Sequence, residues 1–280
     1  MKISLKDAAI RLARAFIAMY AVLFFLQRVF IFPAYMADFT LGKMKYPNDY
    51  GLKDFTENSL LTDDYVRIIG WSHAPTKGMP VILYFHGNAM HIGARAPRFK
   101  AFTDAGYGVF ALSYRGYGRS EGSPSEEGLY RDARAAMAWL NTHYAHPKVI
   151  VYGESLGSGV AAETAKEYPL FGVVLQSAYT SVADVAGESF WFLPGTHALV
   201  RDPFDSLSKL PQIHCPILIL HGDKDEVIPF VHGQKLAVNA SEPMRFIPVH
   251  GAGHLNIPDA IIIKSMNEFF LSHASEGKRP

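Results

Sequence analysis

The segment Val149-Ile-Val-Tyr-Gly-Glu-Ser-Leu-Gly157 carries an apolar run directly into a G-x-S-x-G pentapeptide, and a helical pattern follows it as far as Tyr168. The two glycines leave room for a sharp turn between a strand and a helix, because a side chain at either position would collide with the adjoining elements. Such a turn strains the serine backbone and lifts its hydroxyl above the sheet, beside helix amides that favour negative charge. The segment therefore predicts a strand, a nucleophilic Ser155 and a helix, in that order.

Other short apolar runs alternate with segments of helical spacing. One helix is expected to begin at Ser125, which has the character of a capping residue, and another lies between Pro258 and Leu271. Several runs are continuously apolar, which is typical of strands covered on both faces. The alternation predicts an α/β fold with a mostly parallel central sheet, helices on both faces and an active site at the carboxyl ends of the strands. The predicted strands are Tyr65–Trp71, Val81–Phe85, Gly108–Tyr114, Val149–Tyr152, Gly172–Gln176, Ile217–Leu220 and Arg245–Val249.

Acidic residues and a histidine follow the last two predicted strands. A serine hydroxyl is a weak nucleophile until a base takes its proton, and that base needs an orienting carboxylate. Asp223, Asp225 and Glu226 come after the run that ends at Leu220, and their spacing does not separate them. His254 lies in a glycine-rich loop after the final strand. The chain order of serine, acid and histidine favours a serine hydrolase.

The composition limits the other classes of function. Apolar residues make up 49% of the 280 residues and charged residues 19%, which is enough apolar material for one large domain with a buried core. The formal net charge of +1 provides no basic field, so we expect no nucleic-acid partner. The single cysteine, Cys215, excludes an internal disulfide framework and a cysteine-rich metal site. We expect no metal and no cofactor.

The N-terminal segment differs from the rest of the chain. Basic residues precede an apolar run from Ala15 to Phe32, which Gln27 and Arg28 interrupt. As a helix its 18 residues would be about 27 Å long, close to the thickness of a bilayer core. We predict that residues 1–33 form a membrane anchor, and the positive-inside rule then puts the remaining domain on the non-cytoplasmic side, the periplasm in a bacterium. A signal-like segment of a secreted protein and an interfacial helix of a peripheral protein are the alternatives.

Two further regions are distinguished by composition. Residues 34–54 are polar and rich in turn residues, and we interpret them as a connector. Residues 55–280 then form the catalytic domain. Within it, residues from about 182 to 214 contain the aromatic run Phe190-Trp-Phe-Leu-Pro194. This run predicts either a small lid with an apolar acyl pocket or, equally, ordinary core.

Five motifs together carry a family resemblance. They are His86-Gly-Asn-Ala89, Ser113-Tyr-Arg-Gly-Tyr-Gly-Arg-Ser120, Gly153-Glu-Ser-Leu-Gly157, His221-Gly-Asp-Lys-Asp-Glu-Val-Ile-Pro229 and Gly251-Ala-Gly-His254. As a set they resemble the Bem46-like branch of the α/β-hydrolases, a group similar to the membrane-anchored ABHD-type serine hydrolases. The likeness covers nearly the whole chain, including the apolar N-terminal segment up to Pro33, but the motifs say little about the substrate.

The resemblance implies a catalytic triad of Ser155, Asp225 and His254, in which Asp225 matches the aspartate of the family's His-Gly-x-x-Asp pattern. His254 would be the general base and Asp225 would orient it. The fold also implies an oxyanion site made of two backbone N–H groups. One belongs to Leu156, directly after the nucleophile, and the other to Asn88, in the loop that a His-Gly dipeptide opens.

The predicted function is hydrolysis of carboxylic esters or thioesters through an acyl-enzyme on Ser155, with small-molecule or lipid-like substrates. Three alternatives stay open at this point. They are a serine aminopeptidase-like peptidase, a catalytically silent membrane-bound scaffold on the same fold, and an acyltransferase that uses the same acyl-enzyme. The oligomeric state is not predicted.

Overall fold

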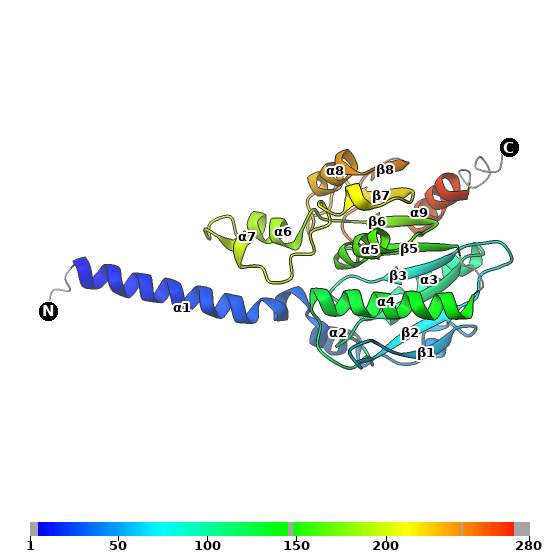
Figure 1. Ribbon diagram of the computed structural model, residues 1–280, viewed down its shortest axis with the longest axis horizontal. Helices are drawn as coiled ribbons and strands as arrows, with labels where there is room; N and C mark the ends of the chain where they lie inside the picture. The colour runs from blue at the N-terminus through cyan, green and yellow to red at the C-terminus, as the bar shows by residue number, and fades with distance from the viewer. Residues whose placement is uncertain (1–4, 145–147, 242, 272–280) are drawn as a thin grey trace.

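A mostly parallel sheet of eight strands forms the centre of the computed structural model, which describes residues 5–144, 148–241 and 243–271 (Figure 1). The strands are β1 (Thr56–Leu61), β2 (Arg67–His73), β3 (Val81–Phe85), β4 (Gly108–Ser113), β5 (Val149–Glu154), β6 (Gly172–Gln176), β7 (Ile217–Gly222) and β8 (Met244–Val249). Their order is β1-β2-β4-β3-β5-β6-β7-β8. Among the described strands, the β1–β2 and β2–β4 pairs are antiparallel, and all other neighbouring pairs are parallel. The predicted α/β class and mostly parallel sheet are confirmed.

All seven predicted strands are present, several with ends that differ by one or two residues, and the main differences lie at the antiparallel edge. β2 begins at Arg67 and not at Tyr65, because Tyr65 has a φ of 62° in the turn that joins β1 to β2. β1 is absent from the prediction. Its sequence, Thr-Glu-Asn-Ser-Leu-Leu, has no apolar alternation, and it buries only Leu60. Pairing along its whole length with β2 makes this polar segment a strand.

Alternate residues of the central strands point to opposite faces of the sheet, and each face has its own apolar core. In β3, for example, Leu83 belongs to one cluster and Tyr84 to the other. The first cluster is covered by α4 (Glu126–His143), α5 (Leu156–Glu167) and α8 (Phe230–Asn239), and the second by α3 (Ala96–Asp104) and α9 (Asp259–Met266), which a π-helical turn (Asn267–Leu271) continues. The predicted start of α4 is confirmed, because the Ser125 hydroxyl accepts the Gly128 N–H over 3.1 Å.

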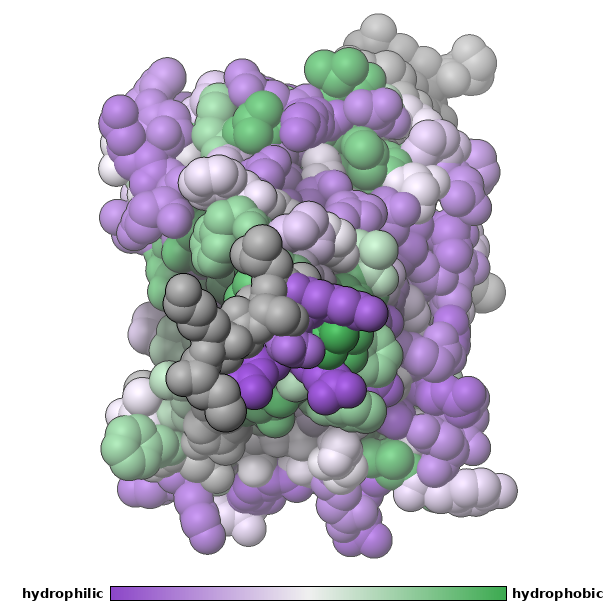
Figure 2. Space-filling view, turned by 90° about the vertical axis from the view of Figure 1, so that its left-hand side faces the viewer, coloured by the Kyte–Doolittle hydropathy of each residue, from purple (hydrophilic) through white to green (hydrophobic). Residues whose placement is uncertain are grey.

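The N-terminal helix α1 (Leu5–Ile31) projects away from the sheet (Figure 1). Residues Ile10–Ile31 have a mean hydropathy of 1.6 and are long and apolar enough to cross a membrane, by length and composition. Figure 2 looks at the molecule from the side of α1 and shows hydrophobic and hydrophilic side chains interspersed near the middle of this face, with mostly hydrophilic ones along its right-hand edge. A short helix, α2 (Ala34–Leu41), and a 3-10 turn (Pro47–Tyr50) lie within the predicted connector.

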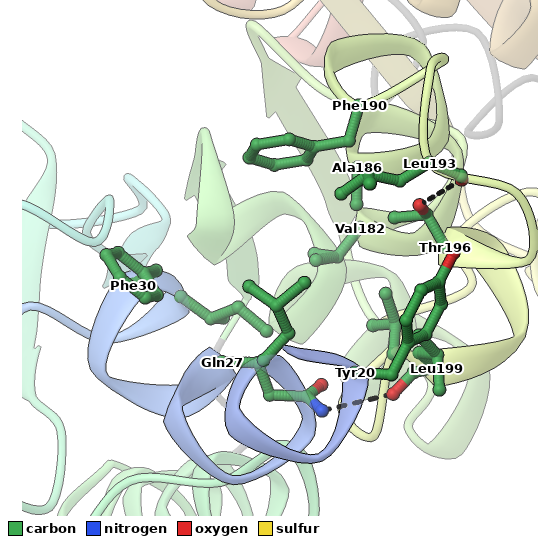
Figure 3. A pocket seen from close by; sticks show the side chains of 12 residues that line it. Tyr20, Gln27, Phe30, Val182, Ala186, Phe190, Leu193, Thr196 and Leu199 are labelled. Carbon is green, nitrogen blue, oxygen red and sulfur yellow. Dashed lines mark hydrogen bonds between the residues drawn. The ribbon is translucent and has the colours of Figure 1, made fainter. Parts of the chain in front are cut away.

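The chain between β6 and β7 leaves the sheet and packs beside α1. It contains α6 (Val182–Ser189), α7 (Thr196–Leu199) and a 3-10 turn (Leu210–Gln212). Figure 1 shows α6 and α7 on the same side of the sheet as α1. Gln27 Nε2 donates to the Leu199 carbonyl over 3.0 Å (Figure 3), and Arg28 pairs with Asp202 at 2.7 Å. We call residues 182–202 the lid segment, the part of the predicted lid that contacts the N-terminal helix.

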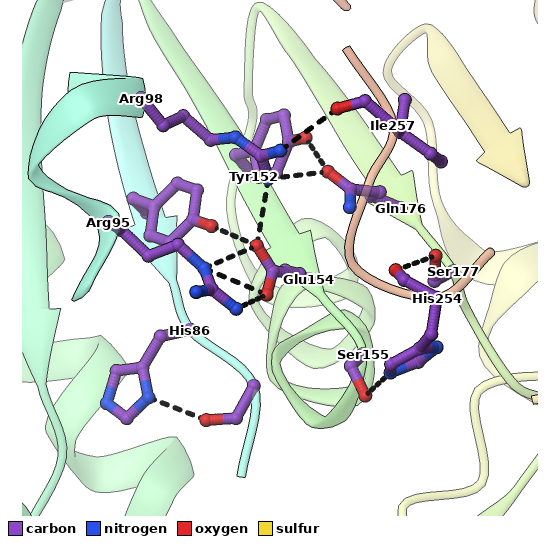
Figure 4. Close-up of polar contacts among 12 residues, drawn as sticks. His86, Arg95, Arg98, Tyr152, Glu154, Ser155, Gln176, Ser177, His254 and Ile257 are labelled. Carbon is purple, nitrogen blue, oxygen red and sulfur yellow. Dashed lines mark hydrogen bonds and ion pairs between the residues drawn. The ribbon is translucent and has the colours of Figure 1, made fainter. Parts of the chain in front are cut away.

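A buried ion cluster joins the sheet to α3 and α9. Glu154, at the end of β5, has 1% relative exposure and accepts hydrogen bonds from Arg95, Arg98 and Tyr84 (Figure 4). Arg98 also donates to Asp259 of α9 over 2.6 Å. Burial alone would raise the pKa of Glu154, but the two guanidinium groups and the Tyr84 hydroxyl lower it to about 2. Glu154 is therefore ionised at neutral pH and holds α3 against the sheet through Arg98, which also binds α9.

Glu154→Gln is expected to lower the free energy of unfolding by about 3–5 kcal/mol, because it removes the anionic partner of Arg95 and leaves Arg98 with Asp259 alone. Urea unfolding of the full chain in detergent at neutral pH measures this loss. The matched control is Glu167→Gln, which removes a more exposed carboxylate from Arg134 and should cost at most about 1 kcal/mol. Equal losses in the two variants would contradict a stabilising role for the buried cluster.

The same carboxylate makes stability depend on pH. Its pKa of about 2 in the folded protein lies below the ordinary 4.5, so the unfolded chain takes up the proton first as the pH falls. The contribution of Glu154 to the free energy of unfolding is on the order of 3 kcal/mol. It is complete above about pH 5 and is lost as the pH falls toward 2. The unfolding free energy should therefore fall more steeply with acidification in the wild type than in Glu154→Gln. Parallel pH profiles would show that Glu154 is not the titrating group.

Candidate active site

Ser155 lies at the turn between β5 and α5, at the carboxyl edge of the sheet. Its φ is 53°, a left-handed conformation that non-glycine residues rarely adopt, and its N–H donates to the Gln176 carbonyl over 3.0 Å. A Cβ at Gly153 would collide with the carbonyl oxygen of Gly157, and a Cβ at Gly157 with that of Phe85. The two glycines thus let the chain turn tightly enough to hold the serine in this strained position.

The structure places Ser155, His254 and Asp225 within hydrogen-bond distance of one another. His254 Nε2 is 2.9 Å from Ser155 Oγ (Figure 4), and His254 Nδ1 is 2.9 Å and 3.0 Å from the two carboxylate oxygens of Asp225. Asp225 follows β7 and His254 follows β8, so three parallel strands deliver the three residues to the same edge of the sheet. All three residues are buried.

Asp225 is held as a carboxylate by its surroundings. Its Oδ1 accepts the N–H groups of Val227 and Ile228 over 2.9 Å and 2.8 Å. Burial would raise the pKa of Asp225, but hydrogen bonds from His221, His254 and the Ile228 N–H hold it well below its ordinary value. The group is therefore negatively charged at neutral pH.

The two neighbouring acids have other roles. Asp223 Oδ1 accepts the Gly251 N–H over 2.8 Å, and its other oxygen lies 3.1 Å from His250 Nδ1, so it joins the loops after β7 and β8. Glu226 is exposed. Contacts thus separate the three acids that sequence spacing alone could not.

The charge on Asp225 determines which nitrogen of His254 carries the hydrogen. A carboxylate only accepts hydrogen bonds, so Nδ1 carries the hydrogen and Nε2 presents its lone pair. That lone pair is 2.9 Å from Ser155 Oγ and can accept the hydroxyl hydrogen. The arrangement is suited to removing a proton from Ser155 as its oxygen attacks an electrophile.

Two backbone N–H groups beside Ser155 are available to bind an anion. They belong to Leu156 and Asn88, and among the residues that the structure describes neither N–H has a backbone acceptor. Leu156 is the first residue of α5, so its N–H is one of the unpaired amides of that helix end. The loop that carries Asn88 runs close to the nucleophile, because a Cβ at Gly87 would lie 3.3 Å from the Ser155 Cβ.

Asn88 is held by two distant parts of the chain. The Tyr117 hydroxyl donates to the Asn88 carbonyl over 2.9 Å, and Asn88 Nδ2 donates to the carbonyl of Ile31, the last residue of α1, over 3.2 Å. Tyr117 belongs to the Ser113–Ser120 motif, to which sequence reasoning assigns no task. Its buried side chain supports the Asn88 loop, a role that no local sequence signal reveals.

His86 supports the same loop from inside the protein. Its ring packs against Tyr114 and Tyr117, with centroid distances of 4.3 Å and 5.1 Å, and its Nδ1 is 2.7 Å from the Gly87 carbonyl. Burial lowers the pKa of His86 to about 4, so the ring is neutral at physiological pH. These contacts fit a structural residue that shapes the loop.

A pocket of about 190 Å³ lies in front of Ser155. Its walls include residues 86–91, Arg95 and two half-exposed apolar side chains, Val227 and Leu255. Sequence reasoning misses these two side chains, because they stand in turns that follow β7 and β8 and only the fold brings them to the pocket. Within the described ranges no group of three or more histidine, cysteine or acidic side chains is placed to hold a metal ion.

Comparison with known proteins places the chain among its relatives. The family described as serine aminopeptidase, S33, matches residues 77–197. An uncharacterized protein of Mycobacterium tuberculosis is 36% identical over 204 residues, which cover 71% of this chain and 72% of that protein. Lysophosphatidylserine lipase ABHD12 of Rattus norvegicus is 31% identical over 253 residues, which cover 74% of this chain and 63% of the lipase. This chain therefore spans less than two thirds of the length of that lipase.

Solved structures share the fold at lower sequence identity. Esterase Pf2001 of Pyrococcus furiosus superposes with a TM-score of 0.67 and 19% identity, over 81% of this chain and 96% of the esterase. An alpha-beta hydrolase of Vibrio vulnificus gives a TM-score of 0.65 and 21% identity, over 87% and 92% of the two chains. Fold, motifs and sequence relatives agree, and the chain belongs to the ABHD-type α/β-hydrolases.

Proposed function

We propose that this protein is a serine hydrolase of carboxylic esters or thioesters, with Ser155 as nucleophile, His254 as general base and Asp225 as orienting acid. The observation that carries the proposal is the 2.9 Å distance from His254 Nε2 to Ser155 Oγ, with His254 Nδ1 facing the Asp225 carboxylate. The esterase and lipase named above are consistent with ester chemistry in this family.

In the first half of the reaction, Ser155 Oγ attacks the carbonyl carbon of the ester while His254 Nε2 takes its proton. The carbonyl oxygen becomes an oxyanion, which the N–H groups of Leu156 and Asn88 bind. The carbon–oxygen bond to the leaving group then breaks, and the departing oxygen receives the proton from His254. The products are an alcohol and an acyl group on Ser155.

In the second half, a water molecule attacks the acyl carbon as His254 takes one of its protons. A second oxyanion forms in the same site and collapses, so that the bond to Ser155 Oγ breaks. The serine oxygen recovers its proton from His254, and the carboxylic acid leaves. Asp225 stays ionised throughout and stabilises the imidazolium that forms twice in each cycle.

The charge of the pocket favours a neutral ester over a peptide with a free amino terminus. Among its described lining residues Glu154 is the one carboxylate, and Arg95 and Arg98 already pair with it. A substrate ammonium would find no free negative partner there. The serine aminopeptidase description of the matching family keeps a peptidase as the second candidate. Amino-acid naphthylamides should be cleaved more slowly than acyl esters, and the reverse order of rates would favour the peptidase.

The site works at a membrane in this proposal. Residues 1–33 serve as the anchor and residues 55–280 as the catalytic domain, and the apolar span Ile10–Ile31 supports this division. Arg11 and Arg14 lie at the end of the span remote from the domain, so the positive-inside rule puts the domain on the non-cytoplasmic side. Lipid-like esters would be within reach of a domain held there.

Ser155→Ala should abolish hydrolysis of p-nitrophenyl acyl esters, with a loss in kcat on the order of 10⁶-fold, and should prevent labelling by a fluorophosphonate probe. The matched control is Ser158→Ala, one helical turn further along α5. The Ser158 hydroxyl is buried without a hydrogen-bond partner in the described structure, so its removal should leave labelling intact. Full labelling of Ser155→Ala would disprove the nucleophile assignment, and a folded wild type that never labels would favour a silent scaffold.

Asp225→Asn is expected to reduce kcat about 10⁴-fold, because the amide can donate to Nδ1 and so favour the wrong tautomer of His254. Asp223→Asn, two residues away, keeps a carbonyl oxygen for the Gly251 N–H and should retain kcat within about tenfold. Steady-state kinetics on acyl esters compares the two variants. An effect of equal size at both positions, or a larger one at Asp223, would overturn the assignment of the acid.

A further inference from the structure

A second pocket lies between α1 and the lid segment (Figure 3). Its volume is about 320 Å³, within the range of small-molecule sites, about 300–1,000 Å³. Leu23, Phe30 and Ile31 of α1 line one wall, and Val182, Ala186 and Phe190 line the other. The pocket is thus built from two segments more than 150 residues apart, and the reaction proposed above assigns it no task.

The polar side chains in the walls are already engaged. Tyr20, Gln27 and Thr196 each donate to a backbone carbonyl of the lid segment. Gln27 Oε1 also accepts the N–H of Arg201 over 2.7 Å. A polar ligand would therefore lose hydrogen bonds to water without replacing them, whereas a hydrocarbon chain has none to lose. The chemistry of the walls selects an aliphatic ligand.

Two hydrogen-bonded residues, Ile31 and Asn88, link the pocket to the site of Ser155. Ile31 forms part of the pocket's wall, and the Ile31 carbonyl accepts the side-chain N–H of Asn88 over 3.2 Å. Asn88 in turn lines the pocket in front of Ser155. A substrate whose carbonyl lies at Ser155 therefore has the apolar pocket as its neighbour on the side of α1.

The apolar pocket also lies at the depth of lipid chains if α1 spans a bilayer. Tyr20, which lines the pocket and binds the lid segment, is 11 residues before the end of the apolar span, or about 16 Å along the helix axis. Trp191 and Phe192 at the tip of the lid segment are 81% and 61% exposed, so apolar surface continues beyond the pocket. A lipid could enter from the surrounding leaflet without passing through water.

We propose that the pocket between α1 and the lid segment binds the acyl chain of the ester substrate, with the helix of the anchor as one wall of the binding site. The substrate class is then an ester of a long-chain fatty acid present in the membrane. This inference rests on the proposed function, since it takes Ser155 as the point at which the ester carbonyl reacts.

The test compares two alkyl fluorophosphonates that differ only in chain length, one ethyl and one hexadecyl. Ser155 Oγ attacks phosphorus, fluoride leaves, and His254 takes the serine proton, so labelling reports the same nucleophile for both probes. The second-order rate constants are measured on the full chain in lipid vesicles. We expect the wild type to react faster with the hexadecyl probe, because each buried methylene favours binding about fourfold.

Ala186→Trp should reduce the ratio of the hexadecyl to the ethyl rate constant at least about tenfold, because the indole fills space that two or more methylenes would occupy. Ala186→Leu, a smaller change, should give an intermediate ratio. The matched control is Gly187→Trp on the same helix. A Cβ at Gly187 meets no atom within 4 Å, so this variant should keep the wild-type ratio. Complete labelling by the ethyl probe shows that each variant is folded.

Leu23→Trp tests the other wall and should lower the same ratio, since Leu23 faces the pocket from α1. A wild type without chain-length preference, or an Ala186→Trp variant with the wild-type ratio, would overturn the inference while Ser155 still labels. An unchanged ratio in Leu23→Trp alone would overturn the contribution of the anchor helix. Failure of the proposed function has a different signature, which is absence of Ser155 labelling by either probe.

Discussion

The close approach of backbone to backbone around Gly153 and Gly157 is the constraint on which the rest of the site depends. Neither position has room for a Cβ, because carbonyl oxygens of neighbouring segments already occupy that space. The chain can therefore reverse direction within a few residues, and Ser155 takes the left-handed conformation that results. Other parts of the site converge on its hydroxyl, from the loops after β3, β7 and β8.

Two buried carboxylates have lowered pKa values for different physical reasons, and the difference suits their positions. Glu154 lies between two guanidinium groups and is fully paired, so it fastens helices to the sheet. Asp225 is stabilised by hydrogen bonds from backbone N–H groups and histidines, without a paired arginine or lysine among the described residues. Its charge is therefore still available to orient and stabilise His254.

Much of the sheet could be predicted from sequence because strands buried on both faces are continuous apolar runs, as in Val81–Phe85. The edge strand β1 could not, since its polar residues become a strand only by pairing with β2. The positions of Ser155 and Leu156 at the turn between β5 and α5 could be predicted, because a local sequence pattern specifies that turn. Contacts such as Gln27 with Leu199 join residues 172 apart, and no local pattern encodes them. The apolar pocket beside α1 depends on contacts of that kind.

The composition of the chain changes at Pro33, but the residue before it still packs into the core of the domain. Phe32 is 3% exposed within the main core cluster, and its ring lies 6.0 Å from that of Phe204. Arg28 supplies the cation beside Asp202, a carboxylate that is 2% exposed. Cutting the chain after Pro33 would uncover apolar core and leave the buried Asp202 carboxylate without its cationic partner. The end of the N-terminal helix is thus packed as part of the domain, so a shortened form of the protein keeps this packing only if it begins before Gln27.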